Sequence, residues 1–346
     1  MTVHGPRLTD VIVIGSGPAG CAAAATCAKA GIDVLIVTEE PEQNSFTSSD
    51  PVPLESIHPG VSSLLEKIGV PGAEVAATRA MYSGIYSNKN YSPLGEDSSG
   101  VWQGMHINRQ IFNHELLQRI QDSGISIRFN EKVESFIKEN NRVAGIKTAS
   151  KELYADYIID ASGKNAVAGK KLNFKRRFYS PPLICSTGLS EIPETFPFDK
   201  NAAHFIPWLN GWTWLAPQPP GHCAWTMLTV QGEKSLLPPE ELKDYPTIGK
   251  IRFANMRWRL FRPVCTESIL LCGDAAGILD PAAGQGIFNA LLSGIQAGQT
   301  VISCIQQPDF EAFHLAAYDD WFVQQFEMKV KLLRSYYEEQ GINIIN

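Results

Sequence analysis

The sequence predicts an α/β fold in which a mainly parallel sheet is interrupted by an insertion of antiparallel strands and followed by a long C-terminal helix. Continuous apolar runs at residues 10–14 and 33–37 are typical of strands buried on both faces of a parallel sheet. Prolines and tryptophans become dense after about residue 173, where the alternation at 225–230 indicates antiparallel strands. The α/β pattern then returns at Ser268.

The junction between the first strand and the first helix carries the motif Gly15-x-Gly17-x-x-Gly20, with Pro18 and Ala19 opening the Ala-rich helix 18–29. In a Rossmann-like unit the first glycine permits a tight turn, the second lets the backbone approach a pyrophosphate, and the third lets helix and strand pack closely. The free N–H groups of the helix then bind the phosphates. The alternative is a plain glycine-rich turn.

An acidic residue is expected at the end of the second strand, where it holds the ribose hydroxyls of a dinucleotide. Thr38 occupies the aligned position and is followed by Glu39 and Glu40. We expect Glu39 to be this acid, although the register leaves its neighbours open and both glutamates can be solvated turn residues.

The remaining elements follow from apolar periodicity. Helices are expected at 61–68 and 107–122, in the Gly/Ala-rich stretch that follows residue 274 and ends at 303, and at 309–339. Strands are expected at 125–129, 132–138, 142–149 and 156–160.

Charge and cysteine usage narrow the class of protein. The 346-residue chain has a formal net charge of -6, which does not indicate binding to nucleic acid or anionic lipid. Its seven cysteines are scattered and never spaced C-x-x-C, so we interpret them as reduced core residues, without a metal site. No secretory signal or membrane-spanning run is visible, and we expect a cytoplasmic protein with no membrane partner.

A second motif lies far downstream, in the segments 271–277 and 280–290. Together with the first motif it resembles the flavoprotein family of p-hydroxybenzoate hydroxylase, geranylgeranyl reductases and tryptophan halogenases. The resemblance implies FAD bound in a Rossmann-like domain of the GR2 type. Asp274, next to Gly273, would bind the ribityl chain. Pro281 and the backbone from Gly284 to Gly286 would line the flavin ring, where N–H groups and a helix dipole favour an anionic reduced flavin.

The same resemblance assigns roles to smaller segments. Arg109 would reach the FAD phosphates, the backbone of Val133 would contact the adenine, and 160–163 would close the ADP site. His58, in the segment 55–60 beside the flavin ring, is a candidate acid or base. The alternatives are a solvated Arg109 and a His58 satisfied by a turn backbone.

The two motifs lie on either side of the β-rich stretch, which predicts a discontinuous cofactor domain. Its segments are 1–75, 101–172 and 263–305, the β-rich substrate or partner domain comprises 76–100 and 173–262, and 306–346 form a C-terminal helical segment. No second Gly-x-Gly-x-x-Gly follows a strand, so we expect no separate NAD(P)H domain.

Trp212 and Trp214, on the substrate side, lie in a segment similar to the Trp-x-Trp-x-Ile-Pro signature of flavin-dependent tryptophan halogenases, with Ala216 at the isoleucine position. The spacing alone also places two aromatic side chains on one face of a strand. Halogenases need a lysine, whereas the corresponding segment 77–82 has only Arg79, a guanidinium that stays charged. Halogenation is therefore disfavoured.

The compact length, the Trp-x-Trp segment and the absent lysine resemble the LodB and GoxB types of flavoprotein maturase. The resemblance implies that an external electron donor and O₂ serve to oxygenate a tryptophan of a protein partner, the precursor of an oxidase with a cysteine tryptophylquinone cofactor. The alternatives are an NAD(P)H-dependent hydroxylase of small aromatic molecules, a reductase of isoprenoid chains, and a non-catalytic FAD scaffold.

Overall fold

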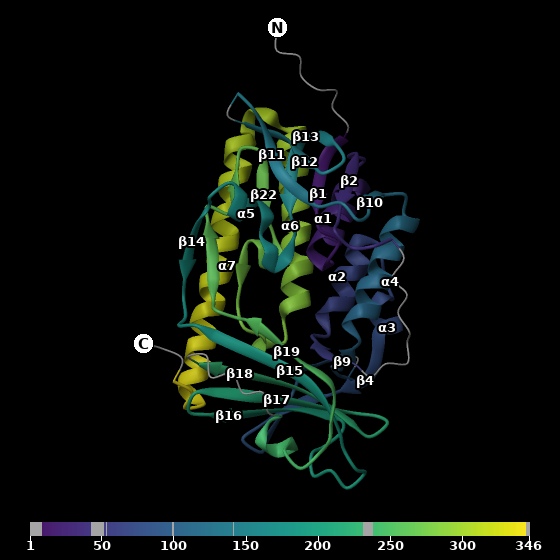
Figure 1. Ribbon diagram of the computed structural model, residues 1–346, viewed down its shortest axis with the longest axis vertical. Helices are drawn as coiled ribbons and strands as arrows, with labels where there is room; N and C mark the ends of the chain where they lie inside the picture. Colours follow the sequence, from purple (N-terminus) through teal and green to yellow (C-terminus); the bar gives the residue numbers. More distant parts are fainter. Residues whose placement is uncertain are drawn as a thin grey trace.

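The computed structural model describes residues 9–42, 52, 54–98, 100–140, 142–230 and 238–343. One end of the elongated molecule holds a sheet with helices beside it, and the other end holds a second sheet (Figure 1). Helix α7 (Glu311–Glu339) runs along the side of the molecule and reaches both ends. The α/β class and the long C-terminal helix are as the sequence predicts.

The first sheet has a parallel centre in the order β10-β2-β1-β13, with β22 also parallel to β13. One edge of the long strand β13 pairs with β12 near its start and with β22 near its end, where Asp160 lies beside Leu271. The carboxyl ends of β1, β13 and β22 therefore meet, which is where ligands bind in open α/β sheets. The strands are β1 (Thr9–Ile14), β2 (Val34–Val37), β10 (Ser126–Arg128), β11 (Val133–Glu139), β12 (Arg142–Thr148), β13 (Glu152–Asp160), β21 (Cys265–Thr266) and β22 (Ile269–Leu271).

Small residues let helix α1 (Pro18–Lys29) pack closely on α6 (Gly286–Gln306). A Cβ atom on Gly294 would lie 2.2 Å from the carbonyl oxygen of Ala19. Such a contact is too short for a side chain, so glycine is required here for the two backbones to approach. The helix that follows the second motif is thereby fixed against the helix that follows the first.

The second sheet has the order β19-β15-β18-β17-β16-β5-β6 and combines both segments of the predicted insertion. Its neighbours are antiparallel except β16 and β5, which run parallel. The strands are β5 (Gly84–Ser87), β6 (Asn90–Pro93), β15 (Leu183–Glu191), β16 (Ala202–Trp208), β17 (Gly211–Gln218), β18 (His222–Val230) and β19 (Thr247–Asn255).

In the described ranges, two three-stranded sheets and four further helices connect these parts. The sheets are β3 (Glu55–Ile57), β9 (Gly104–Ile107) and β4 (Thr78–Tyr82), and β14 (Lys175–Phe178), β20 (Arg259–Arg262) and β23 (Gly277–Ile278). The helices are α2 (Gly60–Ile68), α3 (Ala73–Ala77), α4 (Arg109–Asp122) and α5 (Val167–Lys171).

The helix expected from residue 107 begins at Arg109, because Asn108 caps it. Asn108 Oδ1 accepts hydrogen bonds from the backbone N–H groups of Gln110 (3.0 Å) and Ile111 (3.1 Å). The two residues assigned too early, 107 and 108, are the end of β9 and the cap. All seven cysteines are buried, as expected for core residues. Within the described ranges, no helix is long and apolar enough to cross a membrane.

Candidate FAD site and adjoining cavity

The Gly15–Gly20 turn has the geometry of a phosphate-binding turn. Gly15 has a φ of 100°, and a Cβ atom there would lie 2.6 Å from the carbonyl oxygen of Ala161. A Cβ atom on Gly20 would lie 2.0 Å from the oxygen of Gly15, whereas one on Gly17 would meet no atom within 4 Å. The turn is thus closed toward the protein and open at Gly17. Helix α1 begins there without a side-chain cap, which leaves its N–H groups available to phosphate.

The second motif forms another open turn at the start of α6. Gly273 has a φ of 57° and its N–H donates to Ser293 Oγ at 2.9 Å, which ties the turn to α6. Gly284 has a φ of 58°, and a Cβ atom on Gly286 would meet no atom within 4 Å. Helix α6 also begins without a side-chain cap. Both motifs therefore present backbone N–H groups to open space, which fits the two halves of a dinucleotide cofactor.

Asp274 lies beside Gly273 in the turn of the second motif and lines a cavity there. Its side chain is accessible from that cavity, and desolvation by the protein packed around it raises the pKa of its carboxyl despite the opposing charges of Arg109 and Arg259. Arg109 itself forms an ion pair with Glu55 (2.7 Å) and its Nε donates to Asn113 Oδ1. The structure thus places the predicted arginine near the predicted ribityl-binding aspartate, with Glu55 as a partner that the sequence did not indicate.

The predicted adenosine side is built around a buried carboxylate. Asp160 accepts hydrogen bonds from the N–H groups of Ser162 (3.0 Å) and Ala168 (2.6 Å), which holds the turn after β13. Val133 is buried at the start of β11. Glu39 lies exposed just beyond the end of β2. Thr38 is instead engaged locally, because its Oγ1 accepts from the N–H of Glu40 and pairs with Ser16 Oγ.

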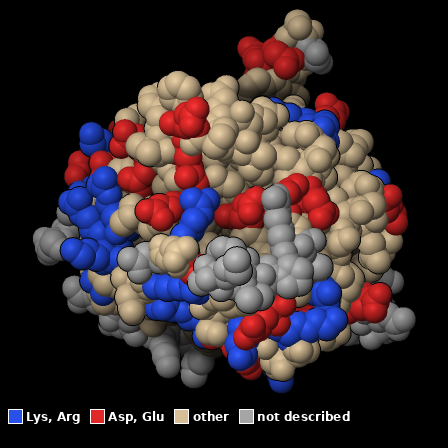
Figure 2. Space-filling view, turned by 90° about the horizontal axis from the view of Figure 1, so that it is seen from above, with Lys and Arg blue, Asp and Glu red and all other residues tan. Residues whose placement is uncertain are grey.

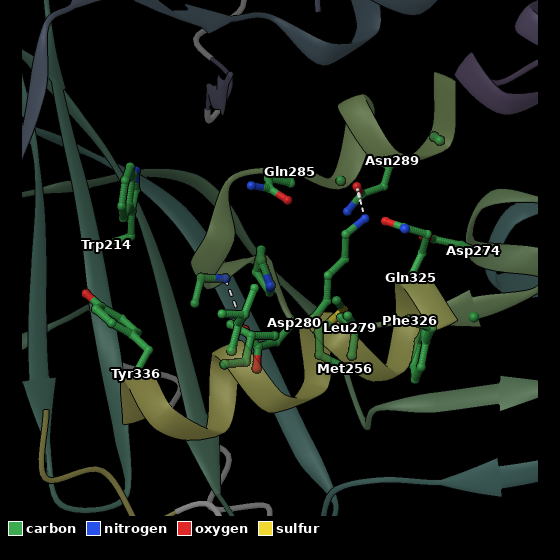
Figure 3. Close-up of a pocket in the computed structure, with 18 of the residues that line it drawn as sticks. Trp214, Met256, Asp274, Leu279, Asp280, Gln285, Asn289, Gln325, Phe326 and Tyr336 are labelled. Carbon is green, nitrogen blue, oxygen red and sulfur yellow. Dashed lines mark hydrogen bonds between the residues drawn. The ribbon is translucent and has the colours of Figure 1, made fainter. Parts of the chain in front are cut away.

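A cavity of about 770 Å³ adjoins the second motif. Aromatic side chains from the second sheet and α7, including Trp214 and Tyr336, line one part, and Asp274, Asn289 and Gln325 lie at the other side of the view (Figure 3). The residues from the second motif that line it are Gly273, Asp274, Gly277, Leu279, Asp280, Pro281, Ala282, Gln285 and Gly286. The cavity therefore connects the predicted flavin-binding loop to the inserted sheet and α7.

Trp214 is held at the cavity wall by a short polar chain. Its indole Nε1 donates to Ser56 Oγ at 3.0 Å, and Ser56 Oγ lies 2.9 Å from His106 Nδ1. His106 is fully buried and stacks on Tyr82 (centroids 4.5 Å apart), and burial lowers the pKa of its imidazole to about 3. His106 is therefore neutral at pH 7, and the chain positions Trp214 without adding charge to the cavity.

The loop Asp280–Gly286 is fixed by buried hydrogen bonds. Asp280 Oδ1 accepts from the Tyr337 hydroxyl (2.7 Å) and from the N–H of Ala282, and Oδ2 accepts from Trp258 Nε1 (2.6 Å). Trp212 Nε1 in turn donates to the Tyr337 hydroxyl at 2.8 Å. Trp212 is fully buried under α7, so only Trp214 of the two predicted substrate-side tryptophans lines the cavity.

Lys329 is a cation inside the cavity that the sequence analysis did not identify. Its Nζ donates to Asn289 Oδ1 at 2.6 Å, and burial lowers the pKa of its amine. No carboxylate oxygen of a described residue forms a salt bridge with it. Its position in α7, between the buried Phe326 and Val330, is the one feature of the sequence that could have indicated it.

His58 does not line the cavity. Its Nδ1 accepts a hydrogen bond from the N–H of Gly60 at 3.0 Å, and its ring packs on Phe288 of α6. Burial lowers the pKa of the imidazole. His58 is thus satisfied by a turn backbone, which is the alternative to the catalytic role, at a position beside the N-terminal half of α6.

Sequence comparisons agree with this geometry. Residues 10–170 match the family model described as FAD dependent oxidoreductase. The chain is 26% identical over 338 residues to digeranylgeranylglycerophospholipid reductase 1 of Methanopyrus kandleri, covering 92% of this chain and 86% of that protein. It is 24% identical over 360 residues to a 1H-pyrrole-2-carbonyl-[peptidyl-carrier protein] chlorinase of Pseudomonas fluorescens, covering 90% and 79%.

Solved structures share the fold. The flavin-dependent brominase Bmp2 has a TM-score of 0.80 at 21% identity, covering 96% of this chain and 88% of that chain. The peptidyl tryptophan dihydroxylase QhpG, described as essential for tryptophylquinone cofactor biogenesis, has a TM-score of 0.72 at 20% identity, covering 98% and 76%. FAD is accordingly the cofactor of this chain.

Proposed function

We propose that this chain, which is an FAD-dependent oxidoreductase, oxygenates a tryptophan side chain of a partner protein during the biogenesis of a quinone cofactor such as cysteine tryptophylquinone. One observation carries the proposal. The cavity that opens from the Pro281–Gly286 loop is bordered by Trp214, Phe205 and Tyr336, aromatic side chains against which an indole can pack. The fold shared with a peptidyl tryptophan dihydroxylase supports the same chemistry.

The site residues fit FAD in two places. The Gly15–Gly20 turn and the N-terminus of α1 would hold the pyrophosphate, with Arg109 near it, and Asp274 and the start of α6 would hold the ribityl chain and ring. When bound and reduced by an external donor, FAD supplies two electrons to O₂, so that one oxygen atom enters the substrate and the other leaves as water.

The protein's own part in this reaction is positioning and exclusion of water. Asp280 fixes the loop that faces the cavity, and Ser56 fixes the indole of Trp214. The aliphatic and aromatic side chains contributed by α7, such as Phe326 and Leu333, form part of the cavity wall. The described residues that line this cavity include no histidine, so the proposal assigns no acid–base residue.

Co-expression with the precursor of an oxidase that carries cysteine tryptophylquinone tests the proposal. We expect the intact mass of the partner to gain oxygen, and peptide mapping to place the oxygen on a tryptophan. The Gly17→Trp variant fills the open face of the phosphate turn and should abolish the modification together with FAD binding. An unmodified partner, in cells where the wild-type protein carries FAD, would contradict the proposal.

A reductase of isoprenoid chains is the second candidate, because apolar side chains of α7 line much of the cavity and the relative from Methanopyrus kandleri is a digeranylgeranylglycerophospholipid reductase. This candidate predicts that a polyprenyl lipid gains hydrogen atoms under anaerobic conditions. The oxygenase requires O₂, so the same preparation assayed with and without O₂ separates the two.

A further inference from the structure

A dense group of cations lies beside the cavity. Segments 164–180 and 256–263 contain nine of the chain's 30 lysines and arginines and no aspartate or glutamate. They include α5, the edge strand β14 and its neighbour β20. Viewed from above, lysine and arginine side chains gather at the left of the molecule, the side on which β14 and α5 lie in Figure 1 (Figure 2). The basic surface is defined as the exposed Lys175, Arg176 and Arg177 together with the partly exposed Arg257 and Arg262.

The charges of the basic surface are poorly compensated within the described part of the chain. Among the described residues, Glu327 is the carboxylate that forms salt bridges with them, and its Oε1 lies 3.9 Å from both Arg177 Nη1 and Arg262 Nη1. Two other cations pack on an aromatic ring: the guanidinium carbons of Arg257 and Arg176 lie 3.9 Å and 5.0 Å from the centre of the exposed Phe178 ring. These contacts orient the guanidinium groups but leave their charge unneutralised.

The basic surface is continuous with the cavity through one small sheet. Strand β14 pairs with β20, and β20 pairs with β23. Gly277 of β23 lines the cavity, as does Met256, which directly precedes Arg257. Inside the cavity Lys329, whose amine donates to an amide oxygen, is the one cation among the described lining residues, and the carboxyls of Asp274 and Asp280 line the same cavity. A ligand that reached the cavity across this sheet would therefore cross positive charge on β14 and β20 before it entered the cavity.

We propose that the partner protein docks an acidic segment on the basic surface, next to the cavity that receives its tryptophan. The formal charge of the whole chain is -6, so the cations of this face stand out against a protein that otherwise repels acidic partners. Charge complementarity therefore selects an acidic segment and also its place of contact. The proposal rests on the proposed function for the identity of the partner as a protein.

Protection of a sheet edge and binding of anionic lipid are two different roles that the same cations could serve. Lysine and arginine on an edge strand prevent sheets from pairing with one another, in which case acidic peptides would not bind. A surface for anionic lipid would bind vesicles in preference to peptides. Neither role accounts for the connection of the cations to the cavity through β20 and β23.

Fluorescence anisotropy of the FAD-loaded protein with a fluorescein-labelled peptide of alternating Glu and Gly tests the proposal. We expect binding that weakens as salt is added, and no binding of the matching Gln and Gly peptide. The Lys175→Glu/Arg176→Glu variant should bind the acidic peptide at least about tenfold more weakly. The control Lys138→Glu/Lys250→Glu makes the same change in net charge at exposed lysines of β11 and β19, and should stay within about twofold of wild type.

The neutral variant Lys175→Gln and the salt dependence of wild type provide the same test if the double variant does not retain FAD. Equal weakening by both double variants would overturn the proposal, as would salt-independent binding. Binding to vesicles of phosphatidylcholine and phosphatidylglycerol without binding to the peptide would also overturn it. Because peptide binding needs no turnover, its failure is distinguishable from failure of tryptophan oxygenation.

Discussion

Replacing Tyr337 by phenylalanine removes one hydroxyl from the centre of the buried network and keeps the ring. The hydroxyl donates to Asp280 Oδ1 at 2.7 Å and accepts from Trp212 Nε1 at 2.8 Å. Trp212 and Tyr337 are fully buried and Asp280 nearly so, so water cannot replace either bond. Loss of a bond to a carboxylate together with an orphaned indole N–H costs about 3 kcal/mol in the free energy of unfolding.

Urea unfolding followed by tryptophan fluorescence measures this change. The control is Tyr154→Phe, because that exposed hydroxyl makes one long bond of 3.4 Å to Glu152 and should leave the unfolding midpoint unchanged. Tyr337→Phe should also weaken FAD binding severalfold, since Asp280 holds the Pro281–Ala283 turn by accepting from the N–H of Ala282. Equal midpoints for wild type and Tyr337→Phe would refute the role assigned to this network.

Three further changes test the cofactor turn, the cavity cation and the C-terminal helix. Gly17→Trp should lower the FAD content at least about tenfold, measured by flavin absorbance, with unfolding little changed because that face is open. Lys329→Met should raise KM for the partner more than it lowers kcat, with Lys329→Arg partly restoring it. Because the pKa of Lys329 is lowered, its positive charge, and with it the effect on KM, should be lost at a lower pH than for an ordinary lysine. Glu311→Gln should cost about 1–2 kcal/mol, since Arg142 (2.8 Å) and Tyr157 (2.5 Å) donate to this partly exposed carboxylate. Burial opposes ionisation of Glu311, but these bonds outweigh it and lower its pKa. These bonds stabilise the folded state at pH values above the pKa of the carboxyl in the unfolded chain, and the stabilisation is lost as the pH falls through the lower pKa of the folded state. The difference in the free energy of unfolding between wild type and Glu311→Gln should therefore shrink in acid.

Local patterns were sufficient to predict the cofactor half of the molecule. The run 10–14, the spacing of Gly15, Gly17 and Gly20, and the helix from Pro18 are short-range features, and the structure reproduces them. The helix expected from residue 107 starts two residues later because the side chain of Asn108, and not apolar periodicity, sets its beginning.

Contacts between distant segments could not be predicted in the same way. The pairing of Asp280 with Tyr337 joins residues 57 positions apart, and Trp214 meets Ser56 across 158 positions. Lys329 lies in a helix that the sequence predicts at 309–339, but only the packing of α7 against α6 shows that this lysine faces a cavity. The net charge of -6 likewise did not indicate the basic surface, because the sum of the charges over the chain carries no information about where they lie in the fold.

Isotope labelling tests the central claim most directly. The FAD-loaded protein, its partner precursor and an electron donor are incubated under ¹⁸O₂ in ordinary water, and the tryptophan peptides of the partner are analysed by mass spectrometry. We expect ¹⁸O in a tryptophan ring with wild type and none with Gly17→Trp. Oxygen that comes from water, or a partner that is modified equally well without FAD, would contradict it.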